Sequence, residues 1–422
     1  MAGLEKQRAQ YKDAVDALAD PARTRLILVA RAQAATLREV TRTHDELAAI
    51  GLTQQLLVIN GVLPQGEAEQ DPLAASIYER EQAALATMPT LLRSLPTDQV
   101  SLKAFNLVGL DALHRLFDPA DRPMDRPMAR QIVASQDEPA SLTAPPLATL
   151  IDEITADGHG LVMLMGKGGV GKMTLAAAVA VAQAERGLPV HLTTSDPAAH
   201  LSETLMSVRD NLTVSRIDPH AETERYRQHV LTTKGAKLDA PGRALLEEDL
   251  RSPCTEEIAV FQAFSRLIRE AGRKFVVMDT APTRHTLLLL DATGAYDREI
   301  QRQMGGKGLH FTNPMMQLQD RKQTKVLLVT LAETTPVLEA AGLQAELRRA
   351  GIEPWAWVIN DSVAAAQPRS PLLCQRARNE RSEIDAVANK HAQRYAVVPL
   401  LAQEPVGVER LLALSELGVP SA

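Results

Sequence analysis

The most constraining feature of this sequence is a glycine-rich stretch between an apolar run and a helix-forming segment. GLVMLM (residues 160–165) is typical of a buried strand, and GKGGVGK follows it directly. The next segment, TLAAAVAVAQAERG, has high helix propensity and ends at Gly187, a residue suited to a helix C-terminus. The pattern therefore predicts a strand, a glycine loop and a helix.

Such a loop is suited to binding phosphate. Glycines let consecutive backbone N–H groups face phosphate oxygens, the helix N-terminus adds a favourable dipole, and Lys172 can neutralise β- and γ-phosphates. A glycine-rich turn without a ligand is the alternative, but four glycines and two lysines between these flanks favour a nucleotide site. The expected nucleotide contacts are Gly166, Gly168, Gly169, Val170, Gly171, Lys172, Met173 and Thr174.

Met173 departs from the pattern of a phosphate loop. The residue after the lysine is usually Ser or Thr, whose hydroxyl binds Mg²⁺, whereas a thioether is a poor ligand for this hard ion. Thr174 cannot simply replace it, because adjacent helical residues point about 100° apart. We expect nucleotide binding with weakened Mg²⁺-dependent hydrolysis; the alternative is a harmless change in which water fills the position.

Two aspartates follow predicted strands. VHLTTSD ends at Asp196 and FVVMD at Asp279, and carboxylates beyond the carboxyl ends of parallel strands can serve phosphoryl transfer. We expect Asp196 to orient the attacking water and Asp279 to lie in the Mg²⁺ shell. Either residue alone is more often a helix cap or a turn former.

An internal repeat at an offset of 300 residues defines the fold class. The segment from Thr24 to Asn60 aligns without a gap with the segment from Thr324 to Asn360, and each is predicted to form a strand, a helix and a strand. ILVA and LLVT suit buried parallel strands. We expect an α/β protein with a mostly parallel, doubly wound sheet, helices on both faces and an incomplete second copy of the same domain.

The two copies differ in what precedes them. The glycine loop lies before the second copy, but only 23 residues precede the first, so the corresponding phosphate loop is expected to be absent from this chain. The predicted organisation is a partial domain at 1–117, a proline-containing linker at 118–146 and a complete domain at 147–422.

Composition narrows the functional class. A net charge of −6 gives no basic footprint, so we expect no nucleic-acid partner. Cys254 and Cys374 are too few for a disulfide framework and are expected to be reduced. No apolar run reaches the roughly 18 residues of a membrane span, and the first residues lack a signal peptide's apolar core. These features predict a cytoplasmic protein.

The additional Lys167 in the loop resembles the deviant Walker A motif of a class of P-loop ATPases. In that class this lysine reaches the nucleotide of a facing domain, so the resemblance implies two P-loop domains face to face. TTSDPAAHLS, LLEEDLRSPCTEEIAVFQAF and VMDTAPTRHTLLLLDATGAY resemble the arsenical pump-driving ATPase family, as does most of the remaining chain. Residues 1–117 resemble the second part of that family's N-terminal half.

The resemblance also implies particular site residues. Cys254 and His285 match positions implicated in binding trivalent arsenic or antimony, whereas Cys374 matches none and is interpreted as structural. Asn360 and the loop from Pro399 match places that contact adenine. Arg284 stands where the family has a glycine, and this charge is expected to disturb the switch segment.

The leading functional hypothesis is a soluble ATPase subunit, with ATP and Mg²⁺, that drives arsenite or antimonite efflux. Lys167 and Lys172 would stabilise charge, and an integral membrane pump would hold the protein at the inner face of the membrane. Further partners considered are a separately encoded N-terminal half, a metallochaperone or a second copy. The alternatives are a hydrolysis-deficient nucleotide-binding fragment and, less favoured, a targeting ATPase for tail-anchored proteins.

Overall fold

The computed structural model describes residues 2–116, 142–195, 205, 209–280 and 314–416. The chain divides into two compact units. The first unit consists of residues 1–140, 367–379 and 401–403, and the second contains the remaining residues. Among the described residues, no helix is both long enough and apolar enough to cross a membrane.

The second unit is built on a parallel sheet of seven strands, in the order β10-β9-β8-β4-β7-β5-β6. Their bounds are β4 Gly160–Met165, β5 Val190–Thr194, β6 Leu212–Arg216, β7 Phe275–Asp279, β8 Thr324–Leu331, β9 Ala356–Ser362 and β10 Tyr395–Pro399. The central strand β4 pairs with β7 on one side and β8 on the other. After β4 the chain builds the strands on one side of it, β5, β6 and β7, and then those on the other side, β8, β9 and β10. The strand order therefore reverses at β4, and ligands of open parallel sheets bind at the carboxyl ends of the strands at such a point, where the loop after β4 lies.

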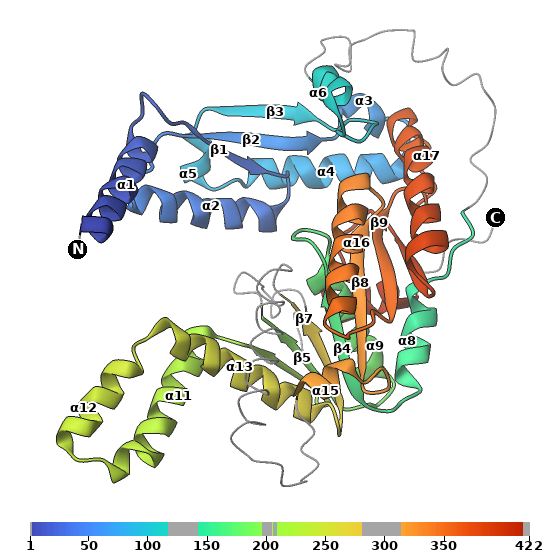
Figure 1. Ribbon diagram of the computed structural model, residues 1–422. Helices are drawn as coiled ribbons and strands as arrows, with labels where there is room; N and C mark the ends of the chain where they lie inside the picture. The colour runs from blue at the N-terminus through green and yellow to red at the C-terminus, as the bar shows by residue number, and fades with distance from the viewer. Residues whose placement is uncertain (1, 117–141, 196–204, 206–208, 281–313, 417–422) are drawn as a thin grey trace. The chain divides into compact units, whose positions relative to one another are not determined.

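The helix after this loop, α9 (Lys172–Glu185), is enclosed by the rest of the unit. Every residue from Leu175 to Ala184 is buried, which explains its alanine- and valine-rich composition. It packs against β4, β5 and β7 and against α18 (Val408–Glu416). Helices cover both faces of the sheet (Figure 1), including α8 (Leu147–Thr155), α15 (Pro314–Gln319) and α16 (Thr334–Arg349). The expected doubly wound α/β fold is therefore confirmed.

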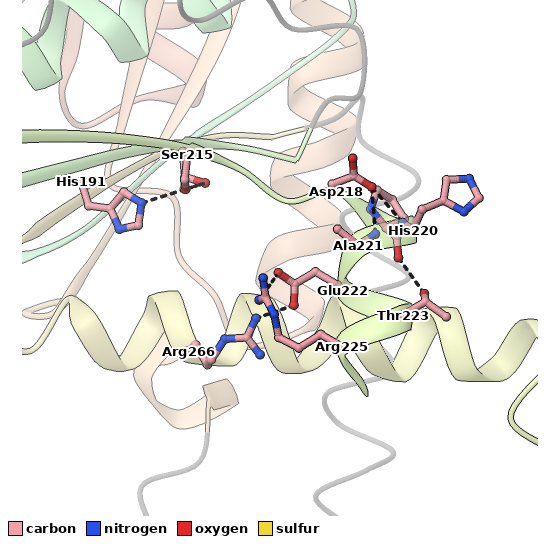
Figure 2. Close-up of polar contacts among 11 residues, drawn as sticks. His191, Ser215, Asp218, His220, Ala221, Glu222, Thr223, Arg225 and Arg266 are labelled. Atoms are coloured by element: carbon pink, nitrogen blue, oxygen red, sulfur yellow. Dashed lines mark hydrogen bonds and ion pairs between the residues drawn. The ribbon is translucent and has the colours of Figure 1, made fainter. Parts of the chain in front are cut away.

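A helical arm extends from this sheet (Figure 1). It comprises α11 (Pro219–Thr233), the 3₁₀ turn η2 (Gly235–Lys237), α12 (Ala240–Asp249) and α13 (Pro253–Glu270). Figure 2 shows how the arm is fixed: Asp218 caps α11, and Glu222 of α11 binds Arg225 and, on α13, Arg266. His191 of β5 links the sheet to the arm: its Nδ1 donates to the Glu270 carboxylate of α13 at 2.8 Å, and its Nε2 is hydrogen-bonded to Ser215 Oγ of β6 at 2.8 Å.

The first unit contains a three-stranded parallel sheet in the order β1-β2-β3. The strands are β1 (Leu26–Ala30), β2 (Gln55–Val62) and β3 (Thr97–Ser101). The helices of the N-terminal segment are α1 (Ala2–Ala19), α2 (Ala34–Ala49), α3 (Gln65–Ala68), α4 (Pro72–Ala86), α5 (Thr90–Arg93) and α6 (Leu110–Leu116). The core of this unit gathers around Leu28, Leu37, Leu57, Ile59 and Leu92 on one face of the sheet.

One helix contributes residues to both units. The first part of α17 (Pro371–Ala386) is grouped with the N-terminal segment, and the second part with the seven-stranded sheet. A π-helical turn, η3 (Val387–His391), follows α17 and leads to β10. The predicted boundaries at 117 and 147 stay a prediction, because residues 117–141 lie outside the described part.

The internal repeat is present in the backbone as well as in the sequence. Helices α2 and α16 start and end at the same offset of 300 residues. Gly51 and Gly351, which follow these helices, have φ of 91° and 77°. In β2 and β9, Gly61 and Asp361 have φ of 74° and 49°. The two copies therefore have left-handed backbone at the same two positions. At the second of these positions, the first copy has Gly61 and the second copy has Asp361.

The burial of the two equivalent strands corrects one expectation. Leu327 and Val329 of β8 are 0% and 1% exposed, but their counterparts Ile27 and Val29 in β1 are 61% and 57% exposed. The prediction that ILVA forms a parallel strand is confirmed, whereas its burial on both faces is wrong. The apolar run is the same, but β1 is an edge strand with side chains packed only on the face of Leu28.

Candidate nucleotide site

The glycine loop in the second unit begins where β4 ends, and its backbone requires glycine at particular positions. Gly166 has φ of 155°, and a Cβ there would collide with the carbonyl oxygen of Val329. Gly171 has φ of 85°, and a Cβ would collide with the side-chain amide of Asn360. Gly169, with φ of 79°, is also left-handed but has open space around it. The loop thus combines backbone curvature with close packing against β8 and β9.

The loop leads into the N-terminus of α9. Gly171 is its N-cap and has no side chain, so no capping side chain competes with an anion for the first N–H groups of the helix. Lys172 is only 6% exposed, and its Nζ donates a hydrogen bond of 2.9 Å to the carbonyl of Lys167. A buried ammonium group folded over a glycine loop at a helix N-terminus is suited to polyphosphate.

Asp279 lies beside the loop at the carboxyl end of β7. It is buried, it is level with Leu164 of β4, and its Oδ2 accepts a hydrogen bond of 3.1 Å from Thr194 Oγ1. The backbone carbonyl of Asp279 accepts another bond from Ser195 N–H, at 3.0 Å. The next residue, Thr280, donates its hydroxyl to the Leu164 carbonyl at 2.9 Å. The first bond holds the carboxylate toward β5, and the last one ties the end of β7 to β4, the strand that carries the loop.

Asn360 contacts the loop directly from β9. Its side chain is 5% exposed, and Nδ2 donates to the Val170 carbonyl at 3.1 Å and to Asp361 Oδ2 at 3.3 Å. The strand β9 continues beyond Asn360 to Ser362, so Asn360 is not the strand's last residue. Pro399 ends the neighbouring strand β10, where it pairs with Ser362.

Lys167 lies on the exposed side of the loop. Its Nζ is 3.0 Å from Glu339 Oε1 of α16, and both side chains are nearly half exposed. An exposed ion pair of this kind contributes at most about 1 kcal/mol, because water and salt screen it. Lys167 can therefore exchange the Glu339 carboxylate for another anion at little cost in free energy.

Met173 and Thr174 occupy the first turn of α9, and both are half-buried. Both residues lie in the helix that follows the loop, as the sequence predicts. Whether Met173 weakens hydrolysis stays a prediction.

Four predicted site residues have no described side chain. Asp196, Arg284 and His285 lie outside the described residues, and Cys254 lies in α13 without a described side chain. Within the described residues, no group of three or more His, Cys, Asp or Glu side chains is arranged to hold a metal. Cys374 is half-buried in α17; burial raises the pKa of its thiol, and its Sγ donates to the Pro368 carbonyl at 3.1 Å.

Sequence reasoning missed two residues of the site and one contact of a residue that it had predicted. Thr194 holds Asp279, Glu339 pairs with Lys167, and Asn360 supports the loop through Val170. The position of Thr194 at the end of a predicted strand, beside Asp196, offered a signal. Glu339 and Asn360 recur in the internal repeat, but the repeat gave no indication that they meet the loop of another segment.

A central parallel strand, a glycine loop, a buried lysine and a strand-end aspartate together define a P-loop nucleoside triphosphatase. The sequence matches the anion-transporting ATPase family over residues 1–119, 159–317 and 310–418. This chain belongs to that family.

Comparison with individual proteins gives the same assignment. The chain is 64% identical over 414 residues to the arsenical pump-driving ATPase of Acidiphilium multivorum, covering 98% of this chain and 70% of that protein. It is 28% identical over 443 residues to the putative arsenical pump-driving ATPase of Halobacterium salinarum, covering 97% and 68%. The chain is 27% identical over 300 residues to the ATPase GET3 of Malassezia globosa, covering 60% of this chain and 88% of that protein.

Proposed function

We propose that this chain hydrolyses ATP as the soluble subunit of an arsenite or antimonite efflux pump. The observation that carries the proposal is the loop geometry, with Lys172 buried over a glycine loop beside Asp279, in a chain 64% identical to arsenical pump-driving ATPases. The similarity to the ATPase GET3 is weaker and shorter, and the arsenical pump-driving relatives favour this function over the alternative of a targeting ATPase.

In the proposed reaction, water attacks the γ-phosphorus of ATP, the bond to the bridging oxygen breaks, and ADP and phosphate are released. Lys172 and the N–H groups at the start of α9 stabilise the charge on the phosphates. Lys167 exchanges Glu339 for a phosphate oxygen. Asp196 is proposed to orient the attacking water; it follows β5, whose last residue Thr194 bonds to Asp279.

The side chains fit Mg²⁺ in part. Asp279 offers a buried carboxylate beside the loop, which suits a hard cation, but Met173 offers a thioether where an oxygen ligand is usual. Bound Mg²⁺ would neutralise charge on the β- and γ-phosphates. Asp279 would hold it directly or through water, and Thr194 would keep that carboxylate oriented.

The test compares ATP turnover by the natural chain and by Met173→Thr, with Mg²⁺, with and without antimonite. Restoring the hydroxyl is expected to raise turnover about tenfold, which corresponds to about 1.4 kcal/mol of activation free energy, while ATP affinity changes little. Lys172→Ala, expected to bind and hydrolyse poorly, controls for contaminating ATPases. An absence of ATP binding by the natural chain would overturn the proposal.

Metalloid and pump binding are proposed from the family. Cys254 offers the thiolate chemistry that trivalent arsenic and antimony prefer, with His285 as a further ligand. Cys254→Ser is expected to abolish acceleration by antimonite while leaving basal turnover unchanged, and Cys374→Ser is the matched control.

Association with the pump would place the protein at the inner membrane face. The protein should then co-sediment with membranes that contain the pump and not with membranes that lack it.

A further inference from the structure

Asn360 is the buried side chain that ties β9 to the phosphate loop. Its Nδ2 donates to the Val170 carbonyl at 3.1 Å, inside the loop and two residues before Lys172. The carbonyl of Val170 therefore points toward β9. Turning a carbonyl away from the phosphate side of a loop helps leave the N–H groups free to face an anion.

The packing around Asn360 restricts the same stretch of loop. Gly171 lies so close to the Asn360 amide that a Cβ at this position would collide with it. Gly171 is also the N-cap of α9, with φ of 85°. Asn360 thus binds the residue before the N-cap of α9, and it also limits the space at the N-cap itself.

The neighbour of Asn360 adds a second constraint. Asp361 has φ of 49°, a left-handed conformation that is unfavourable for a residue with a Cβ, and its Oδ2 accepts a bond of 3.3 Å from Asn360. The repeat counterpart, Gly61, adopts the same region with φ of 74° without such a side chain. The carboxylate of Asp361 therefore helps orient the Asn360 amide.

The repeat also provides a natural comparison. Asn60 occupies the equivalent position in β2, but it is exposed, whereas Asn360 is 5% exposed. The same residue type at the same place in the strand is therefore buried where a phosphate loop packs on it.

We propose that Asn360 is a positioning residue of the phosphate loop, acting on polyphosphate affinity through Val170 and Gly171. This inference rests on the proposed ATP-binding function. This role is separate from the adenine contact that the family resemblance implies for Asn360: it acts on the phosphates through the loop, so it should persist for a ligand that lacks a base.

The first experiment compares the binding of ATP and of inorganic tripolyphosphate, which lacks a base, by the natural chain, Asn360→Ala and Asn60→Ala. Asn360→Ala is expected to weaken the binding of tripolyphosphate about tenfold, the scale of one lost hydrogen bond to a buried carbonyl, and the binding of ATP by at least as much. Asn60→Ala is expected to leave both affinities unchanged. Unfolding midpoints without ligand separate this effect from loss of folding.

Weakened ATP binding with unchanged tripolyphosphate binding would overturn the inference and assign Asn360 to the base. Unchanged affinity for both ligands would also overturn it. If the natural chain binds neither ligand, both the proposed function and this inference fail.

A second measurement uses the collision at Gly171. Gly171→Ala is expected to weaken ATP binding in the natural chain, and its effect is expected to be at least threefold smaller in the Asn360→Ala background, because the colliding amide is gone. The positive φ at this position remains unfavourable for the introduced alanine in both backgrounds. Additive effects of the two substitutions would contradict the inference, since residues in contact should couple.

Discussion

Among single residues, the glycines of the loop differ in why they are needed. Gly166 and Gly169 both have positive φ. A Cβ added at Gly166 would collide with the backbone oxygen of Val329, whereas a Cβ added at Gly169 would meet open space. Gly166→Ala should therefore distort the start of the loop and weaken ATP binding by at least tenfold. Gly169→Ala is the matched control, because it introduces backbone strain of about 1 kcal/mol without a collision. Equal effects in an ATP-binding titration would contradict this account.

At the same scale, Glu81 gives a prediction about pH. Burial raises the pKa of its carboxyl above the ordinary value of 4.5, against the bond from Leu63 N–H and the charges of Arg31 and Arg80. Because the folded pKa is the higher one, the protonated form favours folding: this stability is fully present below pH 4.5 and is lost as pH rises through the raised pKa.

Glu81→Gln keeps an oxygen that can accept the bond from Leu63 but cannot ionise. The variant should equal the natural chain in unfolding free energy below pH 4.5 and exceed it at pH 7. The difference should be a fraction of a kcal/mol, because solvent screens this half-buried group. Urea unfolding across this range measures it, and a difference that shrinks with rising pH would contradict the assignment.

Among the elements of the first unit, the N-terminus of α17 depends on carboxylates from the N-terminal segment. Asp71 caps α4 through Leu73 N–H, and its other oxygen accepts bonds from the N–H groups of Arg369 and Ser370 at 2.7 and 3.2 Å. Glu67 Oε2 accepts a further bond from Leu372 N–H at 3.1 Å. A single buried side chain therefore satisfies donors at two helix starts.

Asp71→Ala should destabilise the first unit by about 1–3 kcal/mol, because it leaves buried backbone donors without a partner. Asp239→Ala removes an exposed cap from α12, which should lower stability by about 1 kcal/mol or less. Far-UV circular dichroism during denaturation by urea measures both. A smaller loss for Asp71→Ala than for Asp239→Ala would show that water replaces these bonds.

The elements also show what the sequence could predict. The strand, loop and helix around Lys172 were identified because composition, glycine spacing and helix propensity agree there. The burial of β1 could not be predicted, because Ile27 and Val29 are as apolar as their buried counterparts in β8. A run of apolar side chains predicts a strand, but the elements that cover it are set by tertiary packing.

For the molecule as a whole, the candidate site was predicted only where its chemistry is local. Lys172 and Asp279 were found from strand ends and the loop, whereas the bond between Asn360 and Val170 joins positions 190 residues apart. Spacing carries no information about such a contact. The repeat revealed two related α/β segments, but the grouping of residues 367–379 with the first unit depends on contacts such as that of Asp71.

The tryptophans allow nucleotide binding to be followed in one part of the molecule. Trp355 and Trp357, the chain's two tryptophans, lie in the second unit, and Trp357 is 1% exposed in β9, the strand that carries Asn360. ATP at 100 times its dissociation constant should stabilise this unit by about 2.7 kcal/mol, because it binds the folded state only. Unfolding followed by tryptophan fluorescence should therefore shift to higher urea with ATP, and Lys172→Ala should abolish the shift. A shift that survives in Lys172→Ala would place the binding of ATP elsewhere than the loop after β4.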